Sequence, residues 1–144
     1  MTDRGLTHVA LPVTDVDVSV EFYRRYADMR VVHDRRDEET GGRVVWISDG
    51  TRPFVVVLIE HAPDGGLSGF AHLGVGVESR AEVERRCREA EGEGRTVLGP
   101  HDAGYPVGYW AFIIDPDGHN LELSYGQEVA LAVEGTIGRD GGDD

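Results

Sequence analysis

The sequence predicts an α+β fold built from two similar units, each a strand followed by a helix and three further strands. The first observation is that THVALPVTD at 7–15 resembles AHLGVGVES at 71–79, so His8 and His72 open equivalent apolar runs 64 residues apart. The same offset relates two further pairs: Trp46 with Trp110, and FVVVLIE at 54–60 with GHNLELS at 118–124. Several matches at one gapless offset indicate an internal duplication.

The first unit is predicted over residues 5–62. Thr14 and Asp15 are residue types that cap helix N-termini, and they precede the amphipathic stretch DVDVSVEFYRRYADM. ETGG places Gly41 and Gly42 at a turn between two strands. The predicted strands of this unit are 6–13, 30–36, 43–49 and 53–61.

The second unit is predicted over residues 69–126. Its helix, at 80–91, carries Val83, Cys87 and Ala90 on one face, and DPDG at 115–118 forms a turn. Its predicted strands are 71–78, 95–98, 108–114 and 119–125. The tail at 127–144 is acidic and Gly-rich, and we expect it to be disordered.

Composition excludes several classes of function. The 144 residues carry a formal net charge of −13, which disfavours nucleic-acid binding and attraction to anionic membranes. All basic residues are Arg, so mechanisms that need a lysine Schiff base or a P-loop lysine are excluded. The sequence has no 18-residue apolar run and no signal-peptide pattern, and its one cysteine rules out an intramolecular disulfide, so we expect a cytoplasmic protein. We expect Cys87 to be a small buried side chain.

Three residues are candidate metal ligands. His8 and His72 occupy equivalent repeat positions, and Glu122 lies within the apolar stretch NLELSY, pointing opposite to its leucine neighbours. A buried carboxylate needs a cation or strong hydrogen-bond donors. If the two units pair their sheets into one cupped surface, the three side chains converge into a 2-His-1-carboxylate set suited to Fe(II), Mn(II) and related ions.

These segments resemble the vicinal oxygen chelate superfamily, which includes glyoxalase I, bleomycin-resistance proteins, fosfomycin-resistance enzymes and extradiol dioxygenases. The resemblance covers residues 5–126 and is most specific in LTHVALPVTDVDVSVEFY, AHLGVGVES and FIIDPDGHNLELSYG. It implies two βαβββ modules that form a cupped mixed sheet around a metal site. By position, His8, His72 and Glu122 match the ligand motif of that family.

The repeat offset tests for a fourth ligand, which glyoxalase-I-like members have. Glu122 minus 64 is Leu58, and leucine cannot coordinate a metal. The sequence therefore resembles the three-ligand members, which include the extradiol dioxygenases and the fosfomycin-resistance enzymes. The bleomycin-binding members bind ligands without metal and lack the triad.

The resemblance to ring-cleaving dioxygenases is incomplete. Phe112 stands where their motif has a Tyr, so a phenolic hydrogen-bond donor is missing. His101, in the loop GPHDAGYPVGYW, is either an acid–base residue or a surface histidine, and its spacing does not match the family motif. Tyr105 and Tyr109 of the same loop either line a mouth over the metal or pack at a sheet rim.

The remaining candidates each have two interpretations. Glu60 is a general base or ligand near the metal, or a solvated carboxylate at a strand end. Trp46 and Trp110, with Phe112, form an apolar wall for the substrate, or they fill the core. Fosfomycin-type thiol transfer needs a cationic cluster, for which Arg52 and Arg43 alone are available, and we regard it as disfavoured.

The sequence therefore predicts a metal-dependent enzyme that chelates two neighbouring oxygens of a small substrate at an extradiol-dioxygenase-like site. The alternatives are a glyoxalase-like lyase or isomerase, and a metal-free antibiotic-binding protein. The expected cofactor is one divalent ion per site, with Fe(II) favoured and Mn, Zn, Ni or Co possible. The resemblance also implies a homodimer, with the site built within one chain or across two.

Overall fold

A computed structural model describes residues 3–62 and 65–140 of the chain. The chain divides into two compact units. The first runs to His72 and also takes in Ile114–Asn120, and the second comprises Leu73–Ile113 and the chain from Leu121 onward. Within the described residues, no helix combines the length and the apolar character needed to cross a membrane.

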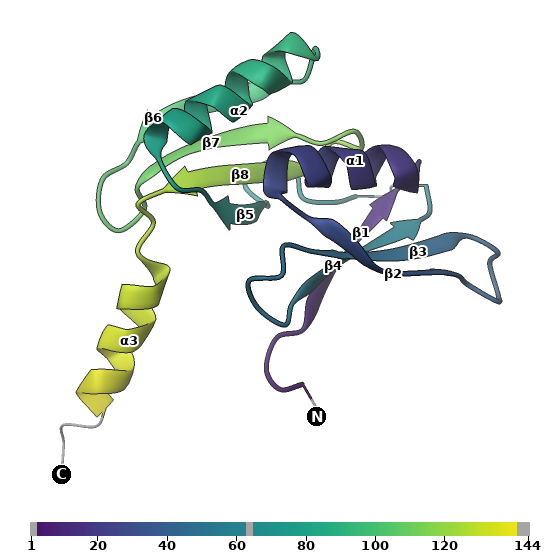
Figure 1. Ribbon diagram of the computed structural model, residues 1–144, viewed down its shortest axis with the longest axis horizontal. Helices are drawn as coiled ribbons and strands as arrows, with labels where there is room; N and C mark the ends of the chain where they lie inside the picture. The colour runs from purple at the N-terminus through teal and green to yellow at the C-terminus, as the bar shows by residue number, and fades with distance from the viewer. Residues whose placement is uncertain (1–2, 63–64, 141–144) are drawn as a thin grey trace. The chain divides into compact units, whose positions relative to one another are not determined.

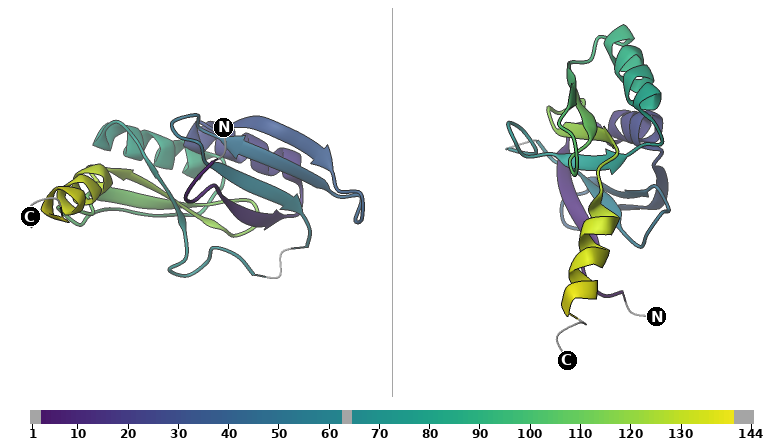
Figure 2. Two further views of the ribbon diagram at one scale, coloured as in Figure 1. Left: turned by 90° about the horizontal axis from the view of Figure 1, so that it is seen from below. Right: turned by 90° about the vertical axis from the view of Figure 1, so that its left-hand side faces the viewer.

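The first unit contains a four-stranded mixed sheet with the strand order β1-β4-β3-β2 (Figure 1). β1 and β4 are parallel, while β4–β3 and β3–β2 are antiparallel. The helix α1 lies against one face of this sheet (Figure 2). The elements are β1 (His8–Val13), α1 (Val16–Ala27), β2 (Arg30–Arg36), β3 (Arg43–Ser48) and β4 (Val55–Glu60).

The sequence explains where α1 begins and which face it buries. The Asp15 carboxylate accepts hydrogen bonds from the backbone N–H groups of Asp17 (3.1 Å) and Val18 (3.3 Å), as expected for an N-cap residue. One face of the helix is fully buried and packs on alternate residues of β1, β3 and β4. This core includes Val16, Phe22, Tyr23, Tyr26, Leu11, Val45, Ile47, Val56 and Leu58.

The second unit repeats the plan, with the strand order β5-β8-β7-β6 and a parallel β5–β8 pair. The Ser79 hydroxyl caps its helix by accepting from the Glu82 N–H at 3.0 Å. Val83, Cys87 and Ala90 are buried, as predicted. The elements are β5 (Leu73–Gly76), α2 (Arg80–Gly92), β6 (Val97–Asp102), β7 (Tyr109–Ile114), β8 (Asn120–Tyr125) and α3 (Val129–Asp140). Over residues 3–62 and 65–140, the predicted α+β class is confirmed by two four-stranded mixed sheets and three helices.

Two predictions of secondary structure need correction, one for a strand and one for the tail. The strand expected at 95–98 lies at Val97–Asp102, because a register shift between Leu98 and His101 lets the strand continue past a Gly-Pro pair. The tail, expected to be disordered, contains α3. Its first turns read VALAVE, in which alanine and leucine are strong helix formers, and that local preference outweighs the later glycines.

The segment Ile114–Asn120 joins β7 to β8 yet belongs to the first unit. The buried Tyr23 hydroxyl donates to Asp115 Oδ2 at 2.8 Å, and the Thr14 N–H donates to Asp117 Oδ1 at 3.1 Å. The ring of His119, which is 1% exposed, contacts the Pro12 carbonyl through Nε2 at 2.8 Å. Because a carbonyl only accepts, Nε2 carries the proton and Nδ1 accepts from the Leu67 N–H at 3.1 Å.

The register of the two parallel strand pairs corrects the repeat offset. In the first unit Ala10 of β1 pairs with Val57 of β4. In the second unit Gly74, the repeat equivalent of Ala10, pairs with Glu122 of β8. The offset is therefore 64 at the first strand of each unit but 65 at the last. The residue equivalent to Glu122 is Val57, and the assignment of Leu58 to that position is wrong by one residue.

Candidate functional site

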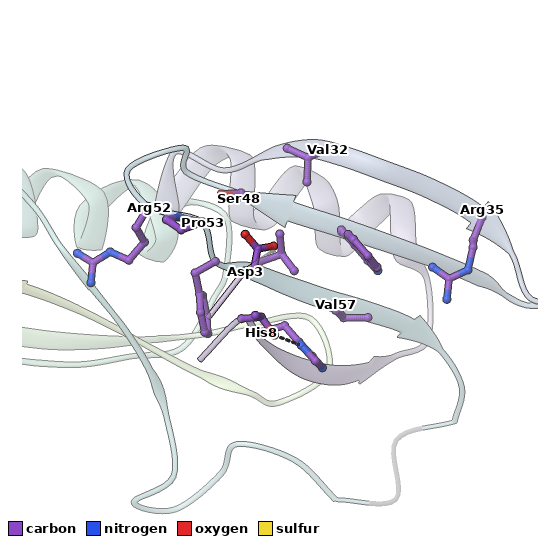
Figure 3. A pocket seen from close by; sticks show the side chains of 12 residues that line it. Asp3, His8, Val32, Arg35, Ser48, Arg52, Pro53 and Val57 are labelled. Atoms are coloured by element: carbon purple, nitrogen blue, oxygen red, sulfur yellow. Dashed lines mark hydrogen bonds between the residues drawn. The ribbon is translucent and has the colours of Figure 1, made fainter. Parts of the chain in front are cut away.

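The first unit has a pocket of about 570 Å³ on the sheet face that α1 leaves open (Figure 3). Strand alternation places His8 of β1, Trp46 of β3, and Val55 and Val57 of β4 on this face, and all four line the pocket. The registers agree, since His8 pairs with Val55 and Trp46 pairs with Val57. The pocket is therefore a property of the sheet itself and lies within one unit.

Ionisable side chains stand around this pocket. Arg35 of β2 and Arg52 of the β3–β4 connection lie at its opposite ends, with His8 and Asp3 between them (Figure 3). The Arg35 guanidinium lies 5.9 Å from the centre of the Trp46 ring, a cation–π distance. Phe54 and Pro53 add apolar surface. The pocket therefore combines an apolar floor with cationic ends.

The two candidate histidine ligands are both exposed and both belong to the first unit. His72 Nδ1 lies 2.7 Å from the Phe70 carbonyl, so it carries the proton and the lone pair is on Nε2. That tautomer suits metal ligation, because a hydrogen-bond acceptor behind the ring orients it toward an ion. His8 Nδ1 lies 2.9 Å from the Thr7 hydroxyl, which can donate or accept.

Glu122, the candidate carboxylate ligand, lies in β8 of the second unit and is only 7% exposed. Its flanking leucines, Leu121 and Leu123, are fully buried. Gly74 lies beside it, and a Cβ at Gly74 would come within 3.2 Å of Glu122 Oε2. The missing side chain at Gly74 thus gives the carboxylate its room. Among the residues the structure describes, no group of three or more His, Cys, Asp or Glu side chains is arranged to hold a metal ion.

Glu60 does not line the pocket. It shares the face of Leu58, which is 0% exposed beneath α1, and its Oε1 accepts from the Arg43 N–H at 3.4 Å. The Arg43 guanidinium is bound at 2.7 Å by Asp17 and at 2.7 Å by Asp34. These contacts lower the pKa of Asp34, and they leave Arg43 engaged rather than available for a ligand.

The residues expected in the loop after β6 lie in different surroundings. His101 is not in a loop but in β6, paired with Trp110, and the two ring centres are 5.2 Å apart. The Tyr109 hydroxyl donates to Glu84 of α2 at 2.8 Å, which raises the pKa of Tyr109, and its ring lies 4.8 Å from the Arg80 guanidinium. Tyr105 is 77% exposed.

The three aromatic residues predicted to form a substrate wall differ in environment. Trp46 lines the pocket of the first unit and is 37% exposed, so it does not fill a core. In the second unit, the ring centres of Trp110 and Phe112 are 5.2 Å apart, and Phe112 is buried. Of the predicted wall, therefore, Trp46 lines a pocket, whereas Trp110 and Phe112 pack on each other.

Sequence reasoning missed several residues of the pocket. His33, interpreted as part of a charged hairpin, is not part of the pocket lining, but its ring packs on Trp46 with ring centres 4.7 Å apart. Arg35 and Asp3 received no role, and Arg52 was considered only for thiol transfer. The available signal was the alternation within β2, since His33 and Arg35 are two residues apart and share one face. Cys87 behaves as expected, because burial raises the pKa of its thiol to about 11.

Comparison with known proteins places the chain in a family. The model of the Glyoxalase/Bleomycin resistance protein/Dioxygenase superfamily matches residues 5–123. The chain belongs to this superfamily. An uncharacterized protein of Pseudomonas aeruginosa, PA2024, is 37% identical over 133 residues, covering 90% of this chain and 94% of its own length. A lactoylglutathione lyase of Escherichia coli O157:H7 is 27% identical over 124 residues, covering 82% and 90%.

Solved structures of superfamily members share the fold. The fosfomycin resistance protein FosX of Listeria monocytogenes, in a mutant form complexed with Mn(II) and a dihydroxypropylphosphonic acid, matches with a TM-score of 0.72 at 16% identity. The match covers 92% of this chain and 99% of that one. TnmS3, an antibiotic binding protein of Streptomyces sp. CB03234, matches with a TM-score of 0.65 at 23% identity, covering 87% and 98%. The superfamily fold thus serves both metal-containing and ligand-binding proteins.

Proposed function

We propose that this superfamily member is a metal-dependent enzyme in which His8, His72 and Glu122 hold one divalent ion. The observation that carries the proposal is the register of the parallel strand pair within each unit. His8 and His72 stand at the start of equivalent strands, and Glu122 lies on the face of its sheet that corresponds to the pocket face of the first unit. A cytoplasmic location, expected from the sequence, belongs to the same proposal.

The donor set suits a divalent ion. Two imidazoles and one carboxylate are the ligands of Fe(II) sites with open positions, and they also bind Mn, Zn, Ni and Co. The His72 tautomer supports this assignment, because its Nε2 carries the lone pair. A divalent ion acts as a Lewis acid that polarises two neighbouring oxygens of a small substrate. His8 brings that chemistry to the pocket, whose apolar floor would orient the rest of the substrate.

The reaction we favour is extradiol-type ring cleavage. Val57 occupies the position equivalent to Glu122 and cannot coordinate, so the chain supplies three ligands rather than four. Three protein ligands leave room for a diol and dioxygen. The groups that usually handle protons are missing, because Phe112 has no hydroxyl and His101 packs on Trp110. We therefore expect catechol cleavage to be slow.

A glyoxalase-like lyase or isomerase is the second candidate. The named function of relatives such as the Escherichia coli lactoylglutathione lyase favours it. The position of Glu60 on the α1 face disfavours it, because isomerisation requires a base near the substrate. Metal-free ligand binding is the third candidate. The likeness to TnmS3 and a pocket formed within the first unit alone support it.

Metal content tests the ligand assignment. Substituting His8, His72 or Glu122 with Ala should reduce bound Fe(II) to a small fraction of the wild-type amount, because two ligands hold a labile ion poorly. His61→Ala is the matched control, since His61 is exposed and its Nδ1 contacts the Ala62 carbonyl. Full metal content in the His8→Ala protein would contradict the proposed triad.

Oxygen uptake separates the reactions. The Fe(II)-loaded protein should consume dioxygen with at least one catechol of a panel, and Phe112→Tyr should increase that rate by restoring a phenolic donor. Turnover of a hemithioacetal or an epoxide under Zn, Ni or Mn, with no uptake from any catechol, would replace the dioxygenase assignment with the lyase. Binding of small molecules with neither metal nor turnover would favour the binding protein.

A further inference from the structure

We propose that the pocket of the first unit binds a flat, apolar small molecule with an anionic group, the anion held by Arg35 and the flat body lying on Trp46. This inference names the ligand class of the site and rests on the proposed function, because His8 lines the same pocket. It is carried by the exposure of Trp46, by the position of Arg35 and by the charge balance around the pocket.

Trp46 provides the flat surface. Its side chain is 37% exposed, although it lies in an inner strand of the sheet, between β2 and β4. His33 packs on the ring and Val57 is its cross-strand neighbour, so the indole has fixed supports. A partly exposed indole that lines a pocket and packs against its neighbours offers a contact surface to a planar ligand.

Arg35 provides the cationic group. Its guanidinium lies over the Trp46 ring, 5.9 Å from the ring centre, so an anionic group on a ligand that contacts the indole is within its reach. In the described part of the chain, no carboxylate lies within ion-pair distance of Arg35. By contrast, Arg43, the first residue of β3 in the same sheet, forms ion pairs with both Asp17 and Asp34. The five donors of an arginine suit bidentate binding of a carboxylate or phosphonate.

The charge balance of the pocket differs from that of the chain. The chain carries a net charge of −13, whereas the described residues that line the pocket include Arg35 and Arg52 and one carboxylate, that of Asp3. Arg52 lies at the far end of the pocket from Arg35 (Figure 3). Because Arg35 is the arginine that contacts the indole, we place the anion at its end of the pocket, and Arg52 reduces repulsion by Asp3.

The size of the pocket agrees with this ligand. A volume of about 570 Å³ lies within the range of small-molecule sites, which is roughly 300 to 1,000 Å³. The lining beyond the charged groups is mainly apolar and comes from Val55, Val57 and Phe54. An aromatic carboxylate with two fused rings is a suitable probe, because it pairs a flat body with one terminal anion.

The test is calorimetric titration of the full-length, metal-depleted protein with 2-naphthoate and with its neutral counterpart, 2-naphthalenemethanol. We expect naphthoate to bind about tenfold more tightly than the alcohol, the effect of one hydrogen-bonded charge. Arg35→Gln should remove this preference, whereas Arg36→Gln, the matched control, should retain it. Arg36 is the next residue of β2 and its guanidinium donates to the Gly41 carbonyl.

Equal affinity for the acid and the alcohol, or an unchanged preference in Arg35→Gln, would overturn the proposal. Loss of preference confined to Arg52→Gln would also overturn it, by placing the anion at the other end. The His72→Ala protein separates this proposal from the metal assignment, because it should lose metal but retain preference for naphthoate. A wild-type protein that binds naphthoate selectively but no metal would refute the proposed enzyme and leave the pocket assignment standing.

Discussion

Val57 and Leu58 are neighbours in β4 with opposite surroundings. Val57 lines the pocket beside His8, whereas Leu58 is fully buried beneath α1 and pairs with Leu11 and Val45. A shift of one residue in a strand moves a side chain to the other face of the sheet. A repeat offset taken from sequence alone therefore places the fourth-ligand position in the core, and the strand register places it in the pocket.

The pair Val57→Glu and Leu58→Glu tests this register. Val57→Glu should fold and bind the divalent ion at least about tenfold more tightly, because it adds a carboxylate on the face of His8, while activity falls with the loss of an open position. Leu58→Glu should lower the free energy of unfolding by about 3 to 5 kcal/mol, because it buries an uncompensated charge. Metal titration and urea denaturation measure the two effects. The opposite pattern would show that the register is wrong.

Tyr23 makes the free energy of unfolding depend on pH in the alkaline range. Burial raises the pKa of Tyr23 well above its usual range, and the nearby Asp115 adds to that shift. The unfolded chain loses this proton near pH 10, while the folded protein retains it. The contribution of Tyr23 to stability is therefore complete below about pH 10 and declines above it, by about 1.4 kcal/mol per pH unit.

Tyr23→Phe should lower the free energy of unfolding at neutral pH by about 1 to 3 kcal/mol, because the buried Asp115 carboxylate loses a donor. The variant should also lose part of the wild-type decline above pH 10. Urea denaturation at a series of pH values measures both effects. Parallel curves for the two proteins above pH 10 would contradict the role given to this hydroxyl.

At the scale of the elements, local sequence signals predicted the helices and strands whose positions depend on interactions between residues close in the sequence. The cap at Asp15 placed α1, the shared face of Val83, Cys87 and Ala90 placed α2, and the apolar runs placed most strands. The Ser79 cap of α2 was not predicted. The strand β6 was missed because Gly99 and Pro100 suggest a loop, and only the pairing with β7 shows the register shift that accommodates them. The helix α3 was missed because the composition of the whole tail obscured its first turns.

Removal of α3 tests whether it contributes to the fold. Val129, Leu131 and Val133 are 57%, 57% and 53% exposed, so the helix buries little apolar surface within its own chain. A chain that ends at Glu128 keeps the Glu128 N–H bonded to the Pro106 carbonyl. It should unfold thermally within a few degrees of the full-length protein. A large fall in the midpoint would mean that α3 has a partner in solution.

At the scale of the molecule, the resemblance implied a homodimer, and this stays a prediction. Two copies related by a two-fold axis would present two equivalent sites. Light scattering at micromolar concentration should give about 31 kDa, twice the chain mass of 15.7 kDa. A mass of one chain would reject the dimer.

The candidate site was only partly predictable from the sequence. His8 was found because it recurs at His72, and Trp46 because it recurs at Trp110. Arg35 and Asp3 have no counterpart in the repeat pattern, and they meet His8 only when β2 and the residues before β1 come together at the pocket. For Arg35 the only signal in the sequence was the alternation of β2, and residues brought together by folding without repetition or motif are otherwise not marked in a single sequence.

The placement of Ile114–Asn120 in the first unit has a consequence for gene architecture. The repeat pattern alone predicts that a duplicated gene can be divided at the junction between its copies, near residue 65. A polypeptide that ends there would lack Asp115 and His119, leaving the Tyr23 hydroxyl without its acceptor and the Pro12 carbonyl without its donor. The first half, expressed as a separate polypeptide, should therefore be less stable than the same residues in the full chain, so that this copy is not a self-sufficient module.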